Sequence, residues 1–326
     1  MSLSKRMNPF LKSNNDTGFG ATTEGYGGRF INKDGSFNVV REGIPVTQKM
    51  SLFNNLLTMP GWEFLLFIFL FFIGINLLFT ILYLMLGENE LTGMLAHTAA
   101  KRFEEIFFFS AQTFTTVGYG RINPVGTMAN VIASSEALSG FLCFAIVTGL
   151  LWGRFSKPKA YLRFSEKAVI APYQDKTGFM FRFTSYKDRH TLTDVEVKVT
   201  LGITLPENSK SAFKFFQLPL ERSRIDSLVM NWTIVHPIDE QSPIFGFTYD
   251  DLKTANAEVY VLVRGFNDVF SNTVLQRTSY RFDEVVFNAK FERMYRESED
   301  GQKTIMELHK LNDYKVLQEK ETGKTS

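Results

Sequence analysis

The chain has 326 residues and carries 36 lysines and arginines against 34 aspartates and glutamates, a formal net charge of +2. This balance argues against a dedicated nucleic-acid binder, which usually has a clustered basic excess. The only cysteine, Cys143, permits neither an intrachain disulfide nor a thiolate metal cluster, and its apolar surroundings predict a buried, inert thiol.

The N-terminal residues divide into two segments of different character. Residues 1–44 are polar and rich in glycine, which predicts a flexible or extended cytoplasmic arm and no signal peptide. They include Gly25-Tyr26-Gly27, a triplet with no apolar helix before it. Residues 45–59 place apolar side chains at helical spacing, which predicts a short slide helix lying at a membrane surface, with packing against protein as the alternative.

Two apolar segments, residues 62–86 and 125–155, are predicted to span a membrane as parts of a pore domain over residues 60–155. The first contains 23 uncharged residues from Phe64 to Leu86, enough to cross a hydrocarbon core of roughly 30 Å. The second is less apolar, which is typical of a helix that faces a water-filled path. Basic residues follow the second span and precede the first, so both termini are expected to be cytoplasmic.

A shorter apolar helix is predicted at residues 101–115, and it leads directly into Thr116-Val117-Gly118-Tyr119-Gly120. A re-entrant helix of this kind is tolerated at membrane depth only where protein or water covers it. Dehydrated K⁺ requires rings of oxygen atoms, which backbone carbonyls and the Thr116 hydroxyl can supply. The two glycines accept backbone angles that a Cβ would crowd, and Tyr119 can pack sideways against the pore helix.

The order of span, short helix, pentapeptide and span therefore predicts a K⁺ selectivity filter at residues 116–120. One chain provides one strand, whereas a ring of carbonyls around an ion needs four. A homotetramer follows from that requirement.

From residue 156 to residue 317 the sequence indicates a cytoplasmic β-sandwich domain. Alternating apolar residues, such as Val195, Val197 and Val199, recur between turn signals, and long helical patterns are absent between them. Asp300-Gly301 predicts a hairpin. Residues 318–326 are expected to form a solvated tail.

Several segments together resemble the inward-rectifier potassium channels, most closely their prokaryotic branch, over about residues 46–296. They are Phe107-Phe108-Phe109-Ser110-Ala111-Gln112-Thr113 before the filter, Ser135-Glu136-Ala137-Leu138-Ser139-Gly140 in the second span, Arg154-Phe155-Ser156-Lys157-Pro158-Lys159 after it, and Arg277-Thr278-Ser279-Tyr280 in the cytoplasmic half. The resemblance implies an α-helical two-span pore with a re-entrant helix, an immunoglobulin-like cytoplasmic sandwich, and a bacterial inner-membrane location.

The resemblance also nominates individual residues. Trp152 lies where the family has a bulky constriction, so it is the expected gate, and Phe141, Phe144 and Thr148 continue a pore-lining stripe at helical spacing. Helix–helix packing is the alternative for that stripe. Arg154, Lys157 and Lys159 lie where anionic phospholipid or phosphoinositide headgroups would be. Ordinary retention of positive charge on the cytoplasmic side explains them equally well.

Three departures from the family pattern bear on function. Phe144 occupies the position at which strong rectifiers have an acid, which puts strong rectification in doubt. The two outer cysteines of eukaryotic members are absent. Gln112 replaces a pore-helix glutamate, so a different bracing arrangement is expected for Arg121. Glu136 is the one acid deep in a span, either functional or hydrogen-bonded behind the filter to Gln112 or Thr113.

Other classes of function find little support. The four histidines are scattered without metal-ligand spacing, and neither a P-loop nor a G-x-S-x-G motif occurs, so no enzyme activity and no cofactor beyond the permeant K⁺ is expected. The alternative from another class is a membrane-anchored β-sandwich that binds or signals without conduction. That alternative leaves the filter pentapeptide and the re-entrant helix unexplained.

Overall fold

The computed structural model describes residues 28–45, 51–187, 191–207 and 210–317. Most of the predicted N-terminal arm with Gly25-Tyr26-Gly27, residues 46–50 of the predicted slide helix and the predicted tail lie outside the described residues. The chain forms two compact units, one comprising Glu42–Lys157 and the other the residues before and after it. The chain passes between the units twice.

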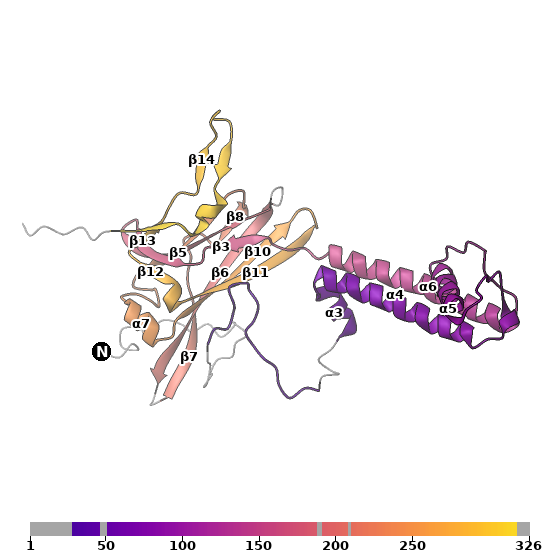
Figure 1. Cartoon of the computed structure of the whole chain (residues 1–326). Coiled ribbons are helices and arrows are strands. Elements are labelled where there is room, and N and C mark those ends of the chain that lie inside the picture. The colour runs from indigo at the N-terminus through magenta and orange to yellow at the C-terminus, as the bar shows by residue number, and fades with distance from the viewer. Residues whose placement is uncertain (1–27, 46–50, 188–190, 208–209, 318–326) are drawn as a thin grey trace, which may run out of the picture. The chain divides into compact units, whose positions relative to one another are not determined.

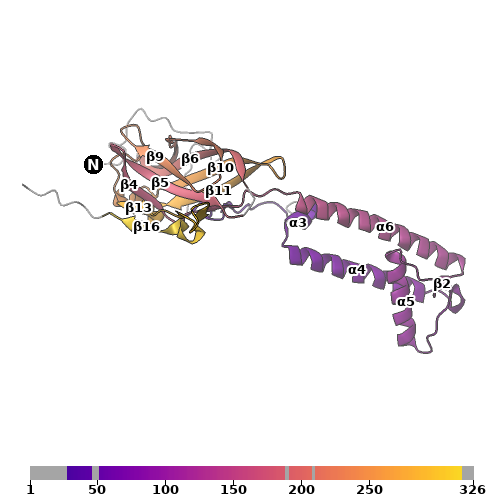
Figure 2. The ribbon, with the colours of Figure 1, turned by 90° about the horizontal axis from the view of Figure 1, so that it is seen from above.

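The first unit is helical. Helices α4 (Gly61–Leu84) and α6 (Thr127–Phe155) lie side by side, as both views show (Figure 1, Figure 2). Both are long and apolar enough to cross a membrane. The shorter α5 (Ala99–Phe114) lies at an angle to this pair (Figure 2).

Local sequence sets where these helices begin. Thr98 caps α5, because its hydroxyl accepts a hydrogen bond from the Lys101 amide at 3.3 Å, and the helix therefore starts two residues before the predicted position. Pro60 precedes α4, where its missing N–H costs nothing. Helix α3 (Leu52–Thr58) is capped by Ser51 and lies within the segment predicted as a slide helix.

Short elements close the loops around α5. They are the 3₁₀ turn η1 (Glu88–Glu90) and the strands β1 (Leu91–Thr92) and β2 (Asn123–Pro124), which pair antiparallel. Buried side chains from α4, α5, α6 and the loops form one cluster that includes Tyr83, Ile106 and Ala129. This cluster fixes α5 against the two long helices.

The second unit is a β-sandwich. Its first sheet has the order β11 (Asn272–Arg281), β10 (Glu258–Asn267), β6 (Leu192–Glu207) and β7 (Lys210–Gln217), with β8 (Arg224–Ser227) also paired to β6. Its second sheet has the order β12 (Val285–Phe287), β4 (Ala168–Tyr173), β5 (Lys176–Ser185) and β3 (Leu162–Phe164), with β9 (Trp232–Ile238) on the other edge of β5.

The core of the sandwich lies between these sheets. Val195, Val197 and Val199 of β6 are at most 1% exposed and face the core, as their alternation predicted. Phe181 and Phe183 of β5 meet them from the other sheet. Helix α7 (Tyr249–Thr254) and the turn η2 (Phe282–Glu284) lead into β10 and β12.

The C-terminal residues add two small ribbons. β13 (Ala289–Phe291) pairs with β16 (Tyr314–Val316), and β14 (Tyr295–Glu297) pairs with β15 (Thr304–Met306), which confirms the predicted hairpin at Asp300-Gly301. The turn η3 (Leu308–Asn312) joins them. Arg182 of β5 is 2% exposed and donates to the carbonyls of Glu292, Lys310, Leu311 and Asp313.

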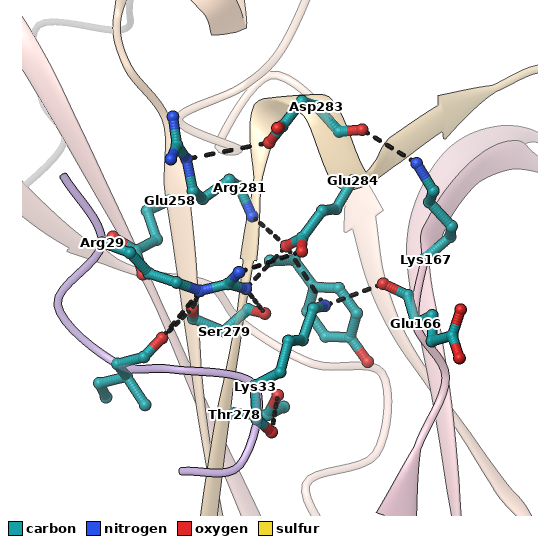
Figure 3. A network of polar contacts seen from close by, with 12 residues as sticks. Arg29, Lys33, Glu166, Lys167, Glu258, Thr278, Ser279, Arg281, Asp283 and Glu284 are labelled. Carbon is teal, nitrogen blue, oxygen red and sulfur yellow. Dashed lines mark hydrogen bonds and ion pairs between the residues drawn. The ribbon is translucent and has the colours of Figure 1, made fainter. Parts of the chain in front are cut away.

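Part of the predicted flexible arm is packed against the sandwich. Phe30 and Ile31 are buried against Phe213, Phe215 and Tyr260. Next to them Arg29 reaches both carboxylate oxygens of Glu284, at 2.7 and 3.1 Å, and Lys33 lies 3.2 Å from the same carboxylate (Figure 3). Composition alone missed this attachment, because its partners come from strands more than 180 residues away in the chain.

Candidate ion-conduction site

The predicted filter begins where α5 ends. Thr115 follows the last helical residue, and the amides of Val117 and Gly118 both donate to the Gln112 carbonyl, at 2.9 and 3.3 Å. The Thr116 amide donates to the Thr113 carbonyl at 3.0 Å. The backbone is therefore anchored to the end of α5 through its N–H groups.

Backbone angles alternate along the same segment. Thr116, Gly118 and Gly120 have positive φ values of 59°, 54° and 79°, whereas Val117 and Tyr119 do not. Alternation of this kind turns successive carbonyl groups toward the same side of the chain. Glycine adopts the left-handed region without a steric penalty, which explains two of the three positions. Asn123 holds the outer end by donating from Nδ2 to the Gly120 carbonyl at 2.8 Å.

The predicted packing of Tyr119 against a pore helix is not seen within one chain. The Tyr119 side chain is 79% exposed, and Val117 is 52% exposed.

The outer end of the site is braced by an ion pair between Arg121 and Glu105 of α5. The Arg121 guanidinium lies 3.1 Å from Glu105 Oε1, and Glu105 Oε2 accepts a hydrogen bond from the Leu95 amide at 3.0 Å. This is the different bracing arrangement expected from the presence of Gln112. Glu105 lies seven residues before Gln112 on α5. Inspection of position 112 alone therefore could not identify Glu105 as the partner of Arg121.

The predicted pore-lining stripe lies on an uncovered face of α6. Phe141, Phe144 and Trp152 are 65%, 73% and 75% exposed, and Thr148 is exposed as well. Cys143, predicted to be buried, is half-buried beside an apolar hollow between α4, α6 and the start of the filter. The role of this stripe as a pore lining stays a prediction.

Two of the three predicted lipid-binding residues are exposed, and the third is engaged elsewhere. Lys157 and Lys159 are exposed. Arg154 instead donates to the carbonyls of Leu56 and Met59 at 2.5 and 2.8 Å, and its guanidinium stacks 4.5 Å from the Phe64 ring centroid. It therefore satisfies the open end of α3 and ties that helix to α6.

Glu136 has partners other than the predicted Gln112 and Thr113. Its carboxyl group accepts hydrogen bonds from the hydroxyls of Tyr83 on α4 and Ser110 on α5. Glu136 could be singled out from the sequence, because an ionisable residue deep in a membrane span is rare. Its partners depend on how three helices pack.

The comparisons with known proteins agree on one family. Residues 162–324 match the model for the inward rectifier potassium channel C-terminal domain, and residues 70–157 match an ion channel model. The inward rectifier potassium channel Kirbac3.1 of Paramagnetospirillum magnetotacticum is 31% identical over 85% of this chain and 92% of its own length.

More distant relatives are animal proteins. The ATP-sensitive inward rectifier potassium channel 12 of Bos taurus is 27% identical over 88% of this chain and 72% of its own length. The inward rectifier potassium channel 18 of Homo sapiens is 26% identical over 88% of this chain and 71% of its own length. Both the helical and the β unit are covered by these matches.

Proposed function

This chain belongs to the inward-rectifier potassium channels, and we propose that four copies of it surround one K⁺-selective path whose filter is formed by residues 116–120. Its relatives are ion channels rather than enzymes. The assignment implies a pore domain over residues 60–155 and a cytoplasmic domain over residues 156–317, in a bacterial inner membrane with both termini in the cytoplasm.

The observation that carries the proposal is the conformation of the filter backbone. Its N–H groups are held by the pore helix, and its φ values alternate in sign, so its carbonyl oxygens can turn together toward an ion. A dehydrated K⁺ needs oxygen atoms on all sides. Four identical strands around an axis meet that need, and the exposed Tyr119 and Val117 give the copies surfaces to cover.

The gate and the lipid contacts follow as parts of the same proposal. Trp152, at the cytoplasmic end of the exposed stripe of α6, would close the path when four indoles meet. Lys157 and Lys159 would contact anionic headgroups, since both are exposed. Arg154 would act indirectly, because it already holds the carbonyl end of α3.

A flux assay with a matched pair of glycine variants tests the proposal. Wild type reconstituted in K⁺-loaded liposomes should take up Rb⁺ in a barium-sensitive way and exclude Na⁺. Gly118→Ala should abolish selective uptake, because alanine at a φ of +54° is strained although the space around it is open. Gly74→Ala is the control: it also meets nothing within 4 Å, but its φ is not positive.

The outcomes separate the parts of the proposal. No barium-sensitive uptake by an assembled wild-type tetramer would overturn conduction and favour the membrane-anchored β-sandwich. Equal uptake of Rb⁺ and Na⁺ would overturn only selectivity. Trp152→Ala should speed uptake, and an unchanged rate would remove Trp152 as the gate.

A further inference from the structure

A group of polar side chains is buried between the three helices of the pore unit. Asn76 and Thr80 of α4, Ser110 of α5 and Glu136 of α6 are each 0% exposed, and Tyr83 of α4 is 1% exposed. Polar groups removed from water require partners, and here they find them in one another. Such a group joins helices in a membrane, where apolar contacts alone give little preference for one arrangement.

Glu136 lies at the centre of this group. The Tyr83 hydroxyl donates to Oε2 at 2.7 Å, and the Ser110 hydroxyl donates to Oε1. One carboxyl group thus receives one hydrogen bond from each of the other two helices. An apolar side chain of the same size could fill the space but could not fix either hydroxyl.

Ser110 has a second possible acceptor for its single hydroxyl proton. Its hydroxyl lies 3.1 Å from Oδ1 of Asn76. Asn76 is itself fixed, because its Nδ2 donates to the Phe72 carbonyl at 2.7 Å and its own carbonyl accepts from the Thr80 hydroxyl at 2.6 Å. Ser110 of α5 is therefore placed between an acceptor on α4 and an acceptor on α6, and in this structure its shorter contact is to Glu136.

The contacts of Ser110 lie close in the chain to the carbonyl group that anchors the filter. Two residues after Ser110 is Gln112, whose carbonyl accepts the Val117 and Gly118 amides. Phe114 and Gly140 lie one helical turn after Ser110 and Glu136, respectively. Their backbones approach so closely that a Cβ on Gly140 would lie 1.9 Å from the Phe114 carbonyl oxygen. The contacts of Ser110 with Glu136 and of Phe114 with Gly140 together set the rotation of α5 about its own axis and its position along α6.

We propose that Glu136 is a positioning residue for K⁺ selectivity, which acts by holding Ser110 and thereby fixing the pore-helix carbonyl that anchors the filter. The inference rests on the proposed function. It predicts that loss of the hydrogen bond loosens the ion sites themselves, and not only the packing of the helices.

The choice of side chains gives the proposal a sharp test. In Glu136→Gln, the amide oxygen can still accept from Tyr83, while its NH₂ group donates to the Ser110 oxygen and Ser110 donates to Asn76 Oδ1. The Glu136→Gln variant therefore keeps a hydrogen bond between α6 and Ser110. In Glu136→Leu the bond from Ser110 to α6 is lost and only its contact with Asn76 of α4 remains, and in Ser110→Ala the hydroxyl itself is missing.

The experiment measures Rb⁺ uptake by full-length tetramers in liposomes, with the half-blocking Ba²⁺ concentration and the Rb⁺/Na⁺ ratio as readouts. Glu136→Leu and Ser110→Ala should each weaken Ba²⁺ block about tenfold, which corresponds to the loss of one hydrogen bond, and should lower the Rb⁺/Na⁺ ratio. Glu136→Gln should stay within about twofold of wild type. Ser135→Ala is the control, because that hydroxyl bonds only within its own helix, to the Val131 carbonyl.

Several outcomes decide the matter. If Glu136→Leu and Ser110→Ala lower the thermal stability of the tetramer but leave Ba²⁺ block and ion ratio unchanged, Glu136 is only structural and the proposal fails. If Glu136→Leu does not assemble, Ser110→Ala decides alone, since it removes a single oxygen atom. A wild type without selective uptake would contradict the proposed function, whereas a selective wild type with selective variants contradicts only this inference.

Discussion

The two units of this protein distribute polar and apolar side chains in opposite ways. In the β-sandwich, Phe181 and Val195 are 0% exposed and lie at the centre of the unit. In the helical unit, Leu65 and Phe69 of α4 are 63% and 59% exposed, while Asn76 and Glu136 are completely buried. Water drives apolar groups inward in the first unit. Lipid removes that drive in the second, so buried hydrogen bonds and close backbone approach hold the helices instead.

One buried ionisable side chain from each unit, Glu136 in the helical unit and Arg182 in the sandwich, shows the same contrast. Glu136 bonds to the side chains of two other helices, whereas Arg182 bonds to backbone carbonyls of the C-terminal segment. Desolvation lowers the pKa of Arg182 to about 10, so the guanidinium remains charged at neutral pH. The helical unit thus fixes helix against helix, and the sandwich fixes a terminal segment against a sheet.

The largest effect is expected where the helical unit depends on backbone contact. Gly140→Ala should prevent correct assembly, because its Cβ would lie 1.9 Å from a carbonyl oxygen that cannot move without displacing α5; we expect a cost of about 3 kcal/mol or more. Size-exclusion chromatography of detergent-extracted protein and Rb⁺ uptake would measure the loss.

The matched control is on the same helix. Gly149→Ala meets nothing within 4 Å and should be tolerated or slightly stabilising. Equal behaviour of the two variants would show that close approach of α6 to α5 is not what holds the unit together.

A smaller effect is expected in the sandwich from Arg182→Met. Methionine keeps an apolar stem beside Phe291 but leaves carbonyls such as those of Leu311 and Glu292 without their donor, at a cost of about 2 kcal/mol. Hydrogen exchange should rise first in residues 289–316, before the sheets open. As the control, Arg224→Met removes an exposed pair with Asp194 and should change stability by less than about 1 kcal/mol. Uniform loss of protection throughout the sandwich would contradict a local role.

The smallest effect is a pH dependence at the attached N-terminal segment. Desolvation lowers the pKa of Lys33 to about 8 from 10.5, although Glu284 opposes the shift. Between these two values the unfolded chain binds more protons than the folded one, so the contribution of Lys33 to stability should rise with pH. Below about pH 8 and above about pH 10.5 it should not vary, because both states then have the same charge.

Thermal unfolding of wild type and Lys33→Met at about pH 7 and about pH 9 would measure this difference. The wild type should gain stability relative to the variant as the pH rises. A relative loss would mean that the ion pair with Glu284 outweighs the cost of burying the ammonium group.

The local features of this protein could be predicted from short stretches of its sequence. Uncharged length indicated two long helices, alternation placed Val195, Val197 and Val199 in a core, and Asp300-Gly301 marked a hairpin. The pentapeptide at residues 116–120 could be recognised because glycines, threonine and a short preceding helix are adjacent in the chain. Each of these signals extends over a few residues, and the chemistry behind it is local.

The contacts between side chains that are distant in the sequence depend on how whole helices and strands pack. Arg121 bonds to Glu105 across the pore helix, Arg154 caps α3 instead of remaining free, and Arg29 reaches Glu284, 255 residues later. Likewise, Glu136 contacts Tyr83 and Ser110 rather than the nearer candidates in the filter region. Such pairings depend on helix rotation and strand order, which are set by the packing of whole elements and leave no trace in local periodicity.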